Sequence, residues 1–458
     1  MATNLGPRQA KSGMERGFNS NFLRLLAGII LMVLTYAAAH GQRHFPTVES
    51  LWAYADAHNV SLILAETNIK TASVNTVQSQ RNRLPTVSLN GGFTDNVLIQ
   101  PTLIPNSLFN PAAPEGTFTE ATFGRQYIYN ASLNLQWNLV NAGDWFSVKA
   151  ARNHEEIARL SLKESKNEVY EQIAKAYYTH FLADQILALG IENKATTDSI
   201  LFIANQKWQE GQVSEIAVNS ARISAVRSEK SLQTAMLNSK RALNTIKQLL
   251  GLGYADSLVL SHEIPADPPV ASGDFAADPE RDIAFARLNL ARTNFQAAKA
   301  SYWPVLSLVY QGNTQVAGDQ LFDFKNANTL PQQYYGLRLS IPLLAGGSRN
   351  AQVARSKLDL ASKTTLYESV TKQNELEDQN LMLDYQTSRD QYNKSKEILE
   401  LYRSNDYHAG QKLREGVISL DERLRSYNDY VANQNEFFQS MSDFLIQQYR
   451  MQIRSKIL

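Results

Sequence analysis

The chain has 458 residues, of which 43% are hydrophobic, and its formal net charge is +1. This balance, and the lack of a basic tract with interleaved aromatic residues, exclude an ordinary nucleic-acid-binding surface, so we expect no nucleic-acid partner. The chain contains no cysteine, which excludes disulfides, zinc–cysteine sites and a lipidated N-terminal cysteine. An oxidising compartment is therefore permitted.

The N-terminus has the pattern of a secretory signal peptide. Arg16 and Arg24 precede the apolar run 25–34, and the small residues 37–39 follow it. A membrane-anchoring helix is the alternative, but the run is shorter than the about 20 apolar residues needed to span a bilayer. We expect residues 1–41 to be a signal peptide with an N-terminal extension.

Two halves of the chain share one pattern, which indicates an internal duplication. A proline opens a strand-like segment at Pro85 and again at Pro304, and the segment Gly211–Ser214 matches Gly416–Ser419. Each copy is predicted to contain, in order, a helix, two strands, a long helix, a tight turn and a further helix. The predicted division is repeat 1 at 42–252 with a tip near 208–215, a linker at 253–279, and repeat 2 at 280–458 with a tip near 413–420.

Four segments alternate between apolar and polar residues, most clearly 127–140, then 87–94 and 335–343, and less cleanly 305–311. Such alternation is typical of membrane-barrel strands, although a half-buried sheet on a soluble core shows it too. Long loops at 96–125 and 317–333 favour the barrel. Because a closed barrel needs about eight strands, several chains must share one, and three chains would supply twelve strands.

Long helices are predicted at 144–207 and 348–412, where there is no proline and almost no glycine. Each would be about 96 Å long at 1.5 Å per residue. Further helices are predicted at 47–83, 213–250, 279–303 and 417–457, and a short strand within the linker at 257–260. A heptad pattern from Leu424 to Leu445 predicts helix packing, and an ordinary solvated coiled coil would show the same pattern.

The sequence lacks the motifs of common enzyme classes: there is no P-loop, G-x-S-x-G, H-E-x-x-H or dinucleotide fingerprint. His40 and His44 have the spacing of a metal pair, but a stable site requires three or four ligands. We therefore expect no enzyme activity, no cofactor and no metal site. The 7 methionines are scattered, which disfavours a copper or silver exporter.

In the order of these motifs the chain resembles the TolC-like outer-membrane efflux proteins, the outer membrane factor family. The resemblance rests on Leu84-Pro85 and Trp303-Pro304 before strands, on 341–353 leading into a long helix, and on 415–421 at a tip. It implies an α+β membrane protein, in which a long coiled-coil α-helical barrel is joined to a transmembrane β-barrel shared by three chains. It also implies the outer membrane of a Gram-negative bacterium, with the helical part extending into the periplasm.

The function implied is that of the exit duct of a tripartite efflux or type I secretion system, which conducts passively from the periplasm to the exterior. The implied partners are two further copies in a homotrimer, a periplasmic adaptor protein, an inner-membrane pump and outer-membrane lipid. The alternative is a periplasmic coiled-coil adaptor or structural spacer. We expect the pump, and not this chain, to select the cargo, whether drug, metal, dye or polypeptide.

The two tips are the candidate adaptor contacts. Gly211 and Gly416 permit the positive φ that ends a helix, and Ser214 and Ser419 can cap the next one. Turn chemistry alone would explain these four residues. Aliphatic neighbours, expected to be exposed for adaptor contact, are Val213, Val417, Ile418 and Leu420.

The resemblance also implies a gate on the helix after the second tip. The candidates are Asp421, Glu422 and Arg425, with Glu422 where an acidic ring residue is expected and Arg425 where a second acid would stand. Repulsion between copies of Glu422 would be relieved by pairing with Arg423 or Arg425. A solvated charge cluster is the alternative interpretation.

Overall fold

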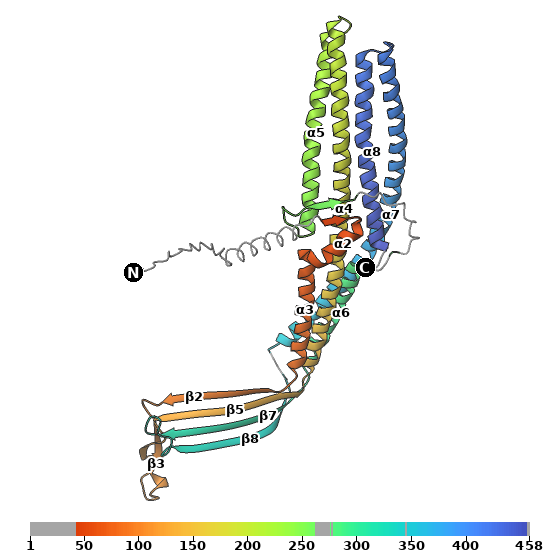
Figure 1. The fold of residues 1–458 in the computed structure, drawn as a ribbon. Helices are drawn as coiled ribbons and strands as arrows, with labels where there is room; N and C mark the ends of the chain where they lie inside the picture. Colours follow the sequence, from red (N-terminus) through yellow and green to blue (C-terminus); the bar gives the residue numbers. More distant parts are fainter. Residues whose placement is uncertain (1–42, 262–274, 276–277, 344–345, 456–458) are drawn as a thin grey trace, which may run out of the picture. The chain divides into compact units, whose positions relative to one another are not determined.

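The structure is a computed structural model that describes residues 43–261, 275, 278–343 and 346–455 (Figure 1). The expected signal peptide, and residues 262–274 and 276–277 of the expected linker, lie outside the described residues. The described chain forms two compact units. Unit 1 contains residues 43–60, 169–261 and 385–449, and unit 2 contains residues 61–168, 275–384 and 450–455 within the described ranges.

Unit 2 contains a four-stranded antiparallel sheet in the order β2-β5-β7-β8. Its strands are β2 (Thr86–Asp95), β5 (Tyr127–Val140), β7 (Val305–Gly318) and β8 (Asn328–Ser340). The predicted strand 127–140 is confirmed at both ends. The loop predicted at 317–333 is wrong, because β7 and β8 extend into it and leave only 319–327. Residues 328–333 of β8 pair with β7 through the backbone, although the sequence does not alternate between apolar and polar residues there.

The loop after β2 contains structure that the sequence did not predict. Strands β3 (Pro101–Pro105) and β4 (Phe118–Thr122) pair as a separate antiparallel hairpin, with the short 3-10 helix η1 (Asn106–Leu108) between them. The two prolines of β3 argued against a strand. They are accommodated because β3 pairs on one side only, so a missing N–H need not break a ladder.

Helices complete unit 2. They are α3 (Val60–Arg81), α6 (Pro279–Ala300) and the parts of α4 (Ala142–Gln209) and α7 (Ser348–Arg414) that belong to this unit. Asp278 caps α6 by accepting a hydrogen bond from the N–H of Glu280 at 2.8 Å. Arg454 donates two hydrogen bonds to the carboxylate of Asp378, at 2.6 and 2.9 Å, and thereby fastens the end of α8 (Leu420–Ser455) to α7.

Unit 1 consists mainly of two helical hairpins, one formed by α4 and α5 (Glu215–Leu249) and the other by α7 and α8 (Figure 1). The bounds agree with the predicted long helices to within a few residues. The heptad seam of α8 is confirmed, since Tyr427, Gln434 and Met441 are each 3% exposed. Ile200, Ala204, Ala217 and Leu424 belong to a shared core cluster, so the two hairpins pack against each other.

The base of unit 1 is closed by a short parallel pair of β1 (Arg43–Phe45) and β6 (Leu258–Leu260), and by α2 (Val48–His58). The short strand predicted at 257–260 is thus confirmed. Trp52 of α2 stacks on Tyr170 with ring centroids 4.9 Å apart and donates from Nε1 to its carbonyl oxygen at 3.0 Å. The single helix predicted at 47–83 is wrong, because Asn59 is extended and its amide donates to the carbonyl of Leu249 at 2.7 Å.

Candidate functional site

The sheet of unit 2 has one apolar and one polar face. The register places Val87 opposite Leu135, Leu135 opposite Tyr310, and Tyr310 opposite Tyr335 in one row across all four strands. A row three residues further along β2, on the opposite face, consists of Asn90, Ser132, Asn313 and Gln332. The apolar face is uncovered within the chain, since Leu89 is 76% and Leu337 is 67% exposed. An apolar surface of this kind marks contact with lipid or with another protein.

Both edges of this sheet are open. Strands β2 and β8 lie at its two ends, and each pairs on one side only. An open edge presents unpaired N–H and C=O groups, which cannot remain unpaired in a lipid environment. Within the described residues, both edges are therefore available for pairing with further strands.

Aromatic residues gather at the end of the sheet near the two loops. The ring centroid of Tyr129 lies 5.0 Å from that of Phe93 and 4.9 Å from that of Phe324. Its hydroxyl accepts a hydrogen bond from the N–H of Phe322 at 3.0 Å and so supports the positive φ of 61° at that residue. Aromatic side chains at strand ends are typical of strands that meet a membrane interface.

At the first tip, Gly211 has φ 73° and ends α4. The N–H of Gln212 donates to the carbonyl of Lys207 at 2.8 Å, which is the long hydrogen bond of a Schellman motif. Ser214 then caps α5, because its hydroxyl accepts from the N–H of Ala217 at 3.3 Å. The predicted turn chemistry is present here.

At the second tip, Gly416 has φ 74°, and the N–H of Val417 donates to the carbonyl of Lys412 at 2.9 Å. Ser419 and Glu422 form a reciprocal capping box: the carboxylate accepts from the N–H of Ser419 at 2.9 Å, and the serine hydroxyl accepts from the N–H of Glu422 at 3.2 Å. The backbone hydrogen bond from Ser419 is the main cause that lowers the pKa of Glu422.

The aliphatic residues at the tips differ in exposure. Val417 is 67% exposed, and Val213 and Ile418 are half-buried. The expectation that Leu420 is exposed is wrong: it is 3% exposed and belongs to the core cluster with Leu413 and Leu424. Ile216 is 75% exposed beside the first tip and was missed, because nothing in the sequence distinguishes it from its neighbour Val218, which is buried.

The gate candidates do not converge within the chain. Asp421, Glu422 and Arg425 are all exposed. The carboxylate of Glu422 is engaged by Ser419, and the charge of Arg425 is only a minor cause of its lowered pKa. Arg423 is buried and pairs with Asp406 of α7 rather than with Glu422, one of its nitrogens lying 3.3 Å from Asp406 Oδ2.

A polar contact between the two hairpins lies further along α8. The hydroxyl of Tyr427 donates to Asn193 Oδ1 of α4 at 2.8 Å, and Asn193 Nδ2 donates to Gln434 Oε1 at 3.4 Å. We call these three residues the hairpin joint. Arg423 lies over the ring of Tyr427 with its guanidinium carbon 5.4 Å from the centroid. Burial raises the pKa of Tyr427 to about 12, so its hydroxyl stays protonated and can donate.

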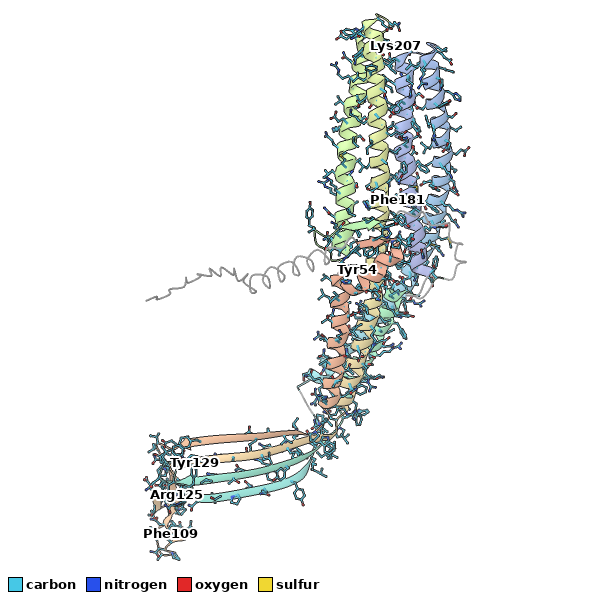
Figure 2. The ribbon with its side chains drawn as sticks, viewed as in Figure 1. Tyr54, Phe109, Arg125, Tyr129, Phe181 and Lys207 are labelled. Atoms are coloured by element: carbon cyan, nitrogen blue, oxygen red, sulfur yellow. The ribbon has the colours of Figure 1, made fainter. Side chains whose placement is uncertain are left out.

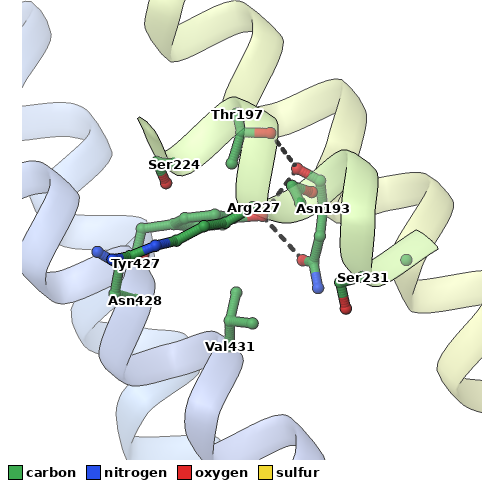
Figure 3. A pocket seen from close by; sticks show the side chains of 10 residues that line it. Asn193, Thr197, Ser224, Arg227, Ser231, Tyr427, Asn428 and Val431 are labelled. Carbon is green, nitrogen blue, oxygen red and sulfur yellow. Dashed lines mark hydrogen bonds between the residues drawn. The ribbon is translucent and has the colours of Figure 1, made fainter. Parts of the chain in front are cut away.

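Beside the hairpin joint is a polar cavity of about 180 Å³ (Figure 3). Small hydroxyl side chains of α5 form one wall, α8 the other, and α4 the floor. The Oγ of Ser228, in the α5 wall, is buried and makes no hydrogen bond to the described residues. The lining residues are Gly190, Asn193, Thr197, Ser224, Arg227, Ser228, Ser231, Tyr427, Asn428 and Val431.

Within the described ranges, no helix is long and apolar enough to pass through a membrane. Among the same residues, no three histidine, aspartate or glutamate side chains are grouped as a metal site would require. His44 Nε2 lies 2.9 Å from the hydroxyl of Ser261, and His40 lies outside the described residues.

Comparison with known proteins gives consistent results. Residues 53–252 match the model of the family described as Outer membrane efflux protein. Outer membrane protein TolC of Escherichia coli K12 is 23% identical over 256 residues, which cover 52% of this chain and 51% of TolC. The match thus spans about half the length of this curated relative.

Solved structures match over a larger part of the chain. The outer membrane protein VceC of Vibrio cholerae superposes with a TM-score of 0.72 at 17% identity, covering 88% of this chain and 95% of VceC. The CmeC outer membrane channel of Campylobacter jejuni gives a TM-score of 0.72 at 16% identity, covering 89% of this chain and 84% of CmeC.

The fold is therefore shared with solved outer-membrane channels, and it combines long helical hairpins with a four-stranded antiparallel sheet. Residues 53–252 are thus similar to the outer membrane efflux proteins, and part of the chain is similar to TolC. These similarities support a location in the outer membrane of a Gram-negative bacterium, with the helical part in the periplasm.

Proposed function

We propose that the chain forms a homotrimeric channel that conducts substrates out of the cell as the exit duct of a tripartite efflux or type I secretion system. The observation that carries this proposal is the four-stranded sheet with one apolar face, one polar face and two open edges. Three copies joined at these edges would supply twelve strands, enough to close a barrel. The apolar face would contact lipid, and the polar face would line a wet lumen.

Conduction in this proposal is passive and includes no chemical step. Rows of amide and hydroxyl side chains, such as Asn90 and Asn313, line most of the path, and Arg338, opposite Ser307 on the same face, adds a positive charge. Such a lining hydrates many solutes and selects few. Substrate choice then belongs to the inner-membrane pump.

We place the adaptor contacts at the tips, as the sequence predicted, with two changes: Ile216 is added and Leu420 is removed. Val417 and Ile216 are the most exposed aliphatic residues there, whereas Leu420 supports the tip from within. The proposed contact residues are Gly211, Val213, Ser214, Ile216, Gly416, Val417, Ile418 and Ser419.

The hairpin joint is the proposed gate contact in place of Glu422. Separating the two hairpins requires the hydrogen bond between Tyr427 and Asn193 to break. The polar cavity beside it is large enough for water, which can replace that hydrogen bond when the hairpins part. Opening therefore need not expose the apolar core at this level.

The first test is the mass of the detergent-extracted protein, corrected for bound detergent, followed by its conductance in planar bilayers. A trimer that conducts supports the proposal. A monomer or dimer in the periplasmic fraction, without conductance, would contradict it and favour the adaptor or spacer function.

The gate is tested with Tyr427→Phe and Asn193→Ala. Each removes the hydrogen bond between hairpins, so we expect higher basal conductance from trimers of normal mass. Tyr430→Phe, on the same helix and packed against the same cluster, is the matched control and should leave conductance unchanged. Equal conductance of all variants and the wild type would show that the hairpin joint does not hold the channel closed.

The tips are tested separately with Val417→Glu and Ile216→Glu, which place a charge on an exposed aliphatic site. We expect drug export to fall while trimer mass and basal conductance remain normal. Glu415→Gln, also exposed beside the second tip, serves as the control. Unchanged drug resistance in the Glu variants would count against adaptor contact at the tips.

A further inference from the structure

The loop between β2 and β5 exposes many apolar side chains. Leu98 is 88%, Leu108 is 72% and Phe109 is 75% exposed, and the loop also presents the exposed residues Val97, Leu103, Phe118 and Phe123. Monomeric proteins rarely expose so many apolar side chains in one segment without a partner for them. This surface, which we call the apolar loop (residues 96–124), is not explained by the sheet or by the tips.

The composition of the apolar loop argues against a role as a lipid anchor. It contains no lysine, arginine, tryptophan or tyrosine, and its only charges are those of Glu115 and Glu120. Segments that anchor at a membrane surface use basic residues and the amphipathic rings of tryptophan and tyrosine. A surface of aliphatic and phenylalanine side chains instead suits burial against another apolar protein surface.

The apolar loop is turned across the end of the sheet. Figure 1 shows β3 running across the direction of the sheet strands at the end where the loops lie. In Figure 2, Phe109 lies beyond Arg125, which is itself next to Tyr129. Arg125 forms an ion pair with Asp319 in the loop between β7 and β8, so the base of the apolar loop is joined to the opposite hairpin of the sheet.

We propose that the apolar loops of three copies contact one another over the outer mouth of the channel and form an apolar lid. This inference rests on the proposed homotrimer, in which edge-to-edge joining of the sheets brings the three loops to the same end. The occupant of each apolar surface is then the same loop of a neighbouring copy. Apolar constrictions hinder conduction because water leaves them, so the lid would narrow the outer end and lower the conductance without abolishing it, independently of the hairpin joint.

The contact is tested by cross-linking, for which the absence of cysteine in the native chain is an advantage. In trimers carrying Phe109→Cys, mild oxidation should produce disulfide-linked dimers. Tyr254→Cys is the control, because this residue is 89% exposed but belongs to unit 1. Intact trimers in which Phe109→Cys stays monomeric on denaturing gels would overturn the lid.

Two further measurements separate the other outcomes. Quenching of a fluorophore at Phe109→Cys by spin-labelled lipid would show that the loop enters the membrane, which would also overturn the lid. In the gate variant Asn193→Ala, adding Leu108→Ser and Phe109→Ser should raise conductance several-fold, and no change would contradict the proposal. A wild-type protein that is not a trimer would instead refute the proposed function, and would be detected by its mass before any cross-linking.

Discussion

The two hairpin tips share a backbone and differ in their side chains. Gly211 and Gly416 have φ values of 73° and 74°, and each is followed by the same long hydrogen bond back into the preceding helix. Only the second tip has a reciprocal capping box, formed by Ser419 and Glu422. Among the described residues, only the second tip also has a buried ion pair within one turn of the cap, that of Arg423 with Asp406.

The two tips therefore retain the same turn chemistry from the duplication, and the second hairpin has additional polar contacts. The turn needs a residue that tolerates positive φ and a cap for the next helix, and both copies retain these. The additional contacts at the second tip continue along α8 from Arg423 to Tyr427 and so reach the hairpin joint. We therefore expect the second tip to be the stiffer of the two.

The largest expected effect comes from the buried ion pair. Asp406→Ala would leave Arg423 buried without its partner, which typically costs about 3–5 kcal/mol. We expect this loss in the local opening free energy of the second hairpin, measured by hydrogen exchange of α8 peptides. Arg403→Ala, which removes an exposed pair with Glu400, is the control and should cost at most about 1 kcal/mol. Equal effects of the two variants would show that the pair is not buried in solution.

Substitution of the tip glycines should affect both tips alike. Gly211→Ala and Gly416→Ala each place a Cβ in a left-handed conformation, which costs about 1–2 kcal/mol. No atom lies within 4 Å of either Cβ position, so the cost is that of the backbone alone. Asn variants should cost less, because Asn tolerates this conformation. Hydrogen exchange measures the stability of each tip in these variants. A loss of stability at one tip only would contradict the shared backbone geometry.

Removing the capping serines should destabilise the two tips to different extents, and by less than the glycine substitutions do. Ser214→Ala and Ser419→Ala each remove a capping hydroxyl, at a typical cost of about 1 kcal/mol. The second should cost more, because it also removes one half of the capping box. Ser220→Ala, inside α5, is a control without a capping position. A greater loss at the first tip would show that the capping box adds nothing.

The smallest expected effect is a dependence on pH at the second tip alone. The folded pKa of Glu422 lies below its ordinary value of 4.5, so its contribution is present above that value and lost as pH falls through the folded pKa. Protection of the α8 N-terminus, corrected for intrinsic exchange, should therefore decline in acid, and Glu422→Gln should abolish this decline. The same acid dependence at the first tip would show that Glu422 is not its source.

Prediction from sequence succeeded where the pattern was long and local. Residues 129–139 of β5 alternate strictly, and the bounds of this strand were predicted without error. The break at Asn59 was missed because it depends on the carbonyl of Leu249, far away in the sequence. The hairpin of β3 and β4 was missed because two prolines normally argue against a strand.

The gate candidates show the same limit. The sequence indicated the correct helix, but it directed attention to exposed charges instead of polar residues in the packed seam. Tyr427 and Gln434 occupy heptad positions that are normally apolar, and this was the signal available. Their partner, Asn193, is separated from them by more than two hundred residues and can be identified only in the folded chain.

The strand count of the sheet has a consequence for how copies join. Because four strands alternate in direction, β2 and β8 run opposite ways at the two edges. The β8 edge of one copy can therefore meet the β2 edge of the next as an ordinary antiparallel pair, and the ring closes without a seam. Loss of a single strand would force a parallel pair at every junction between copies. Evolution of this sheet is thus expected to add or remove strands as hairpins, two at a time.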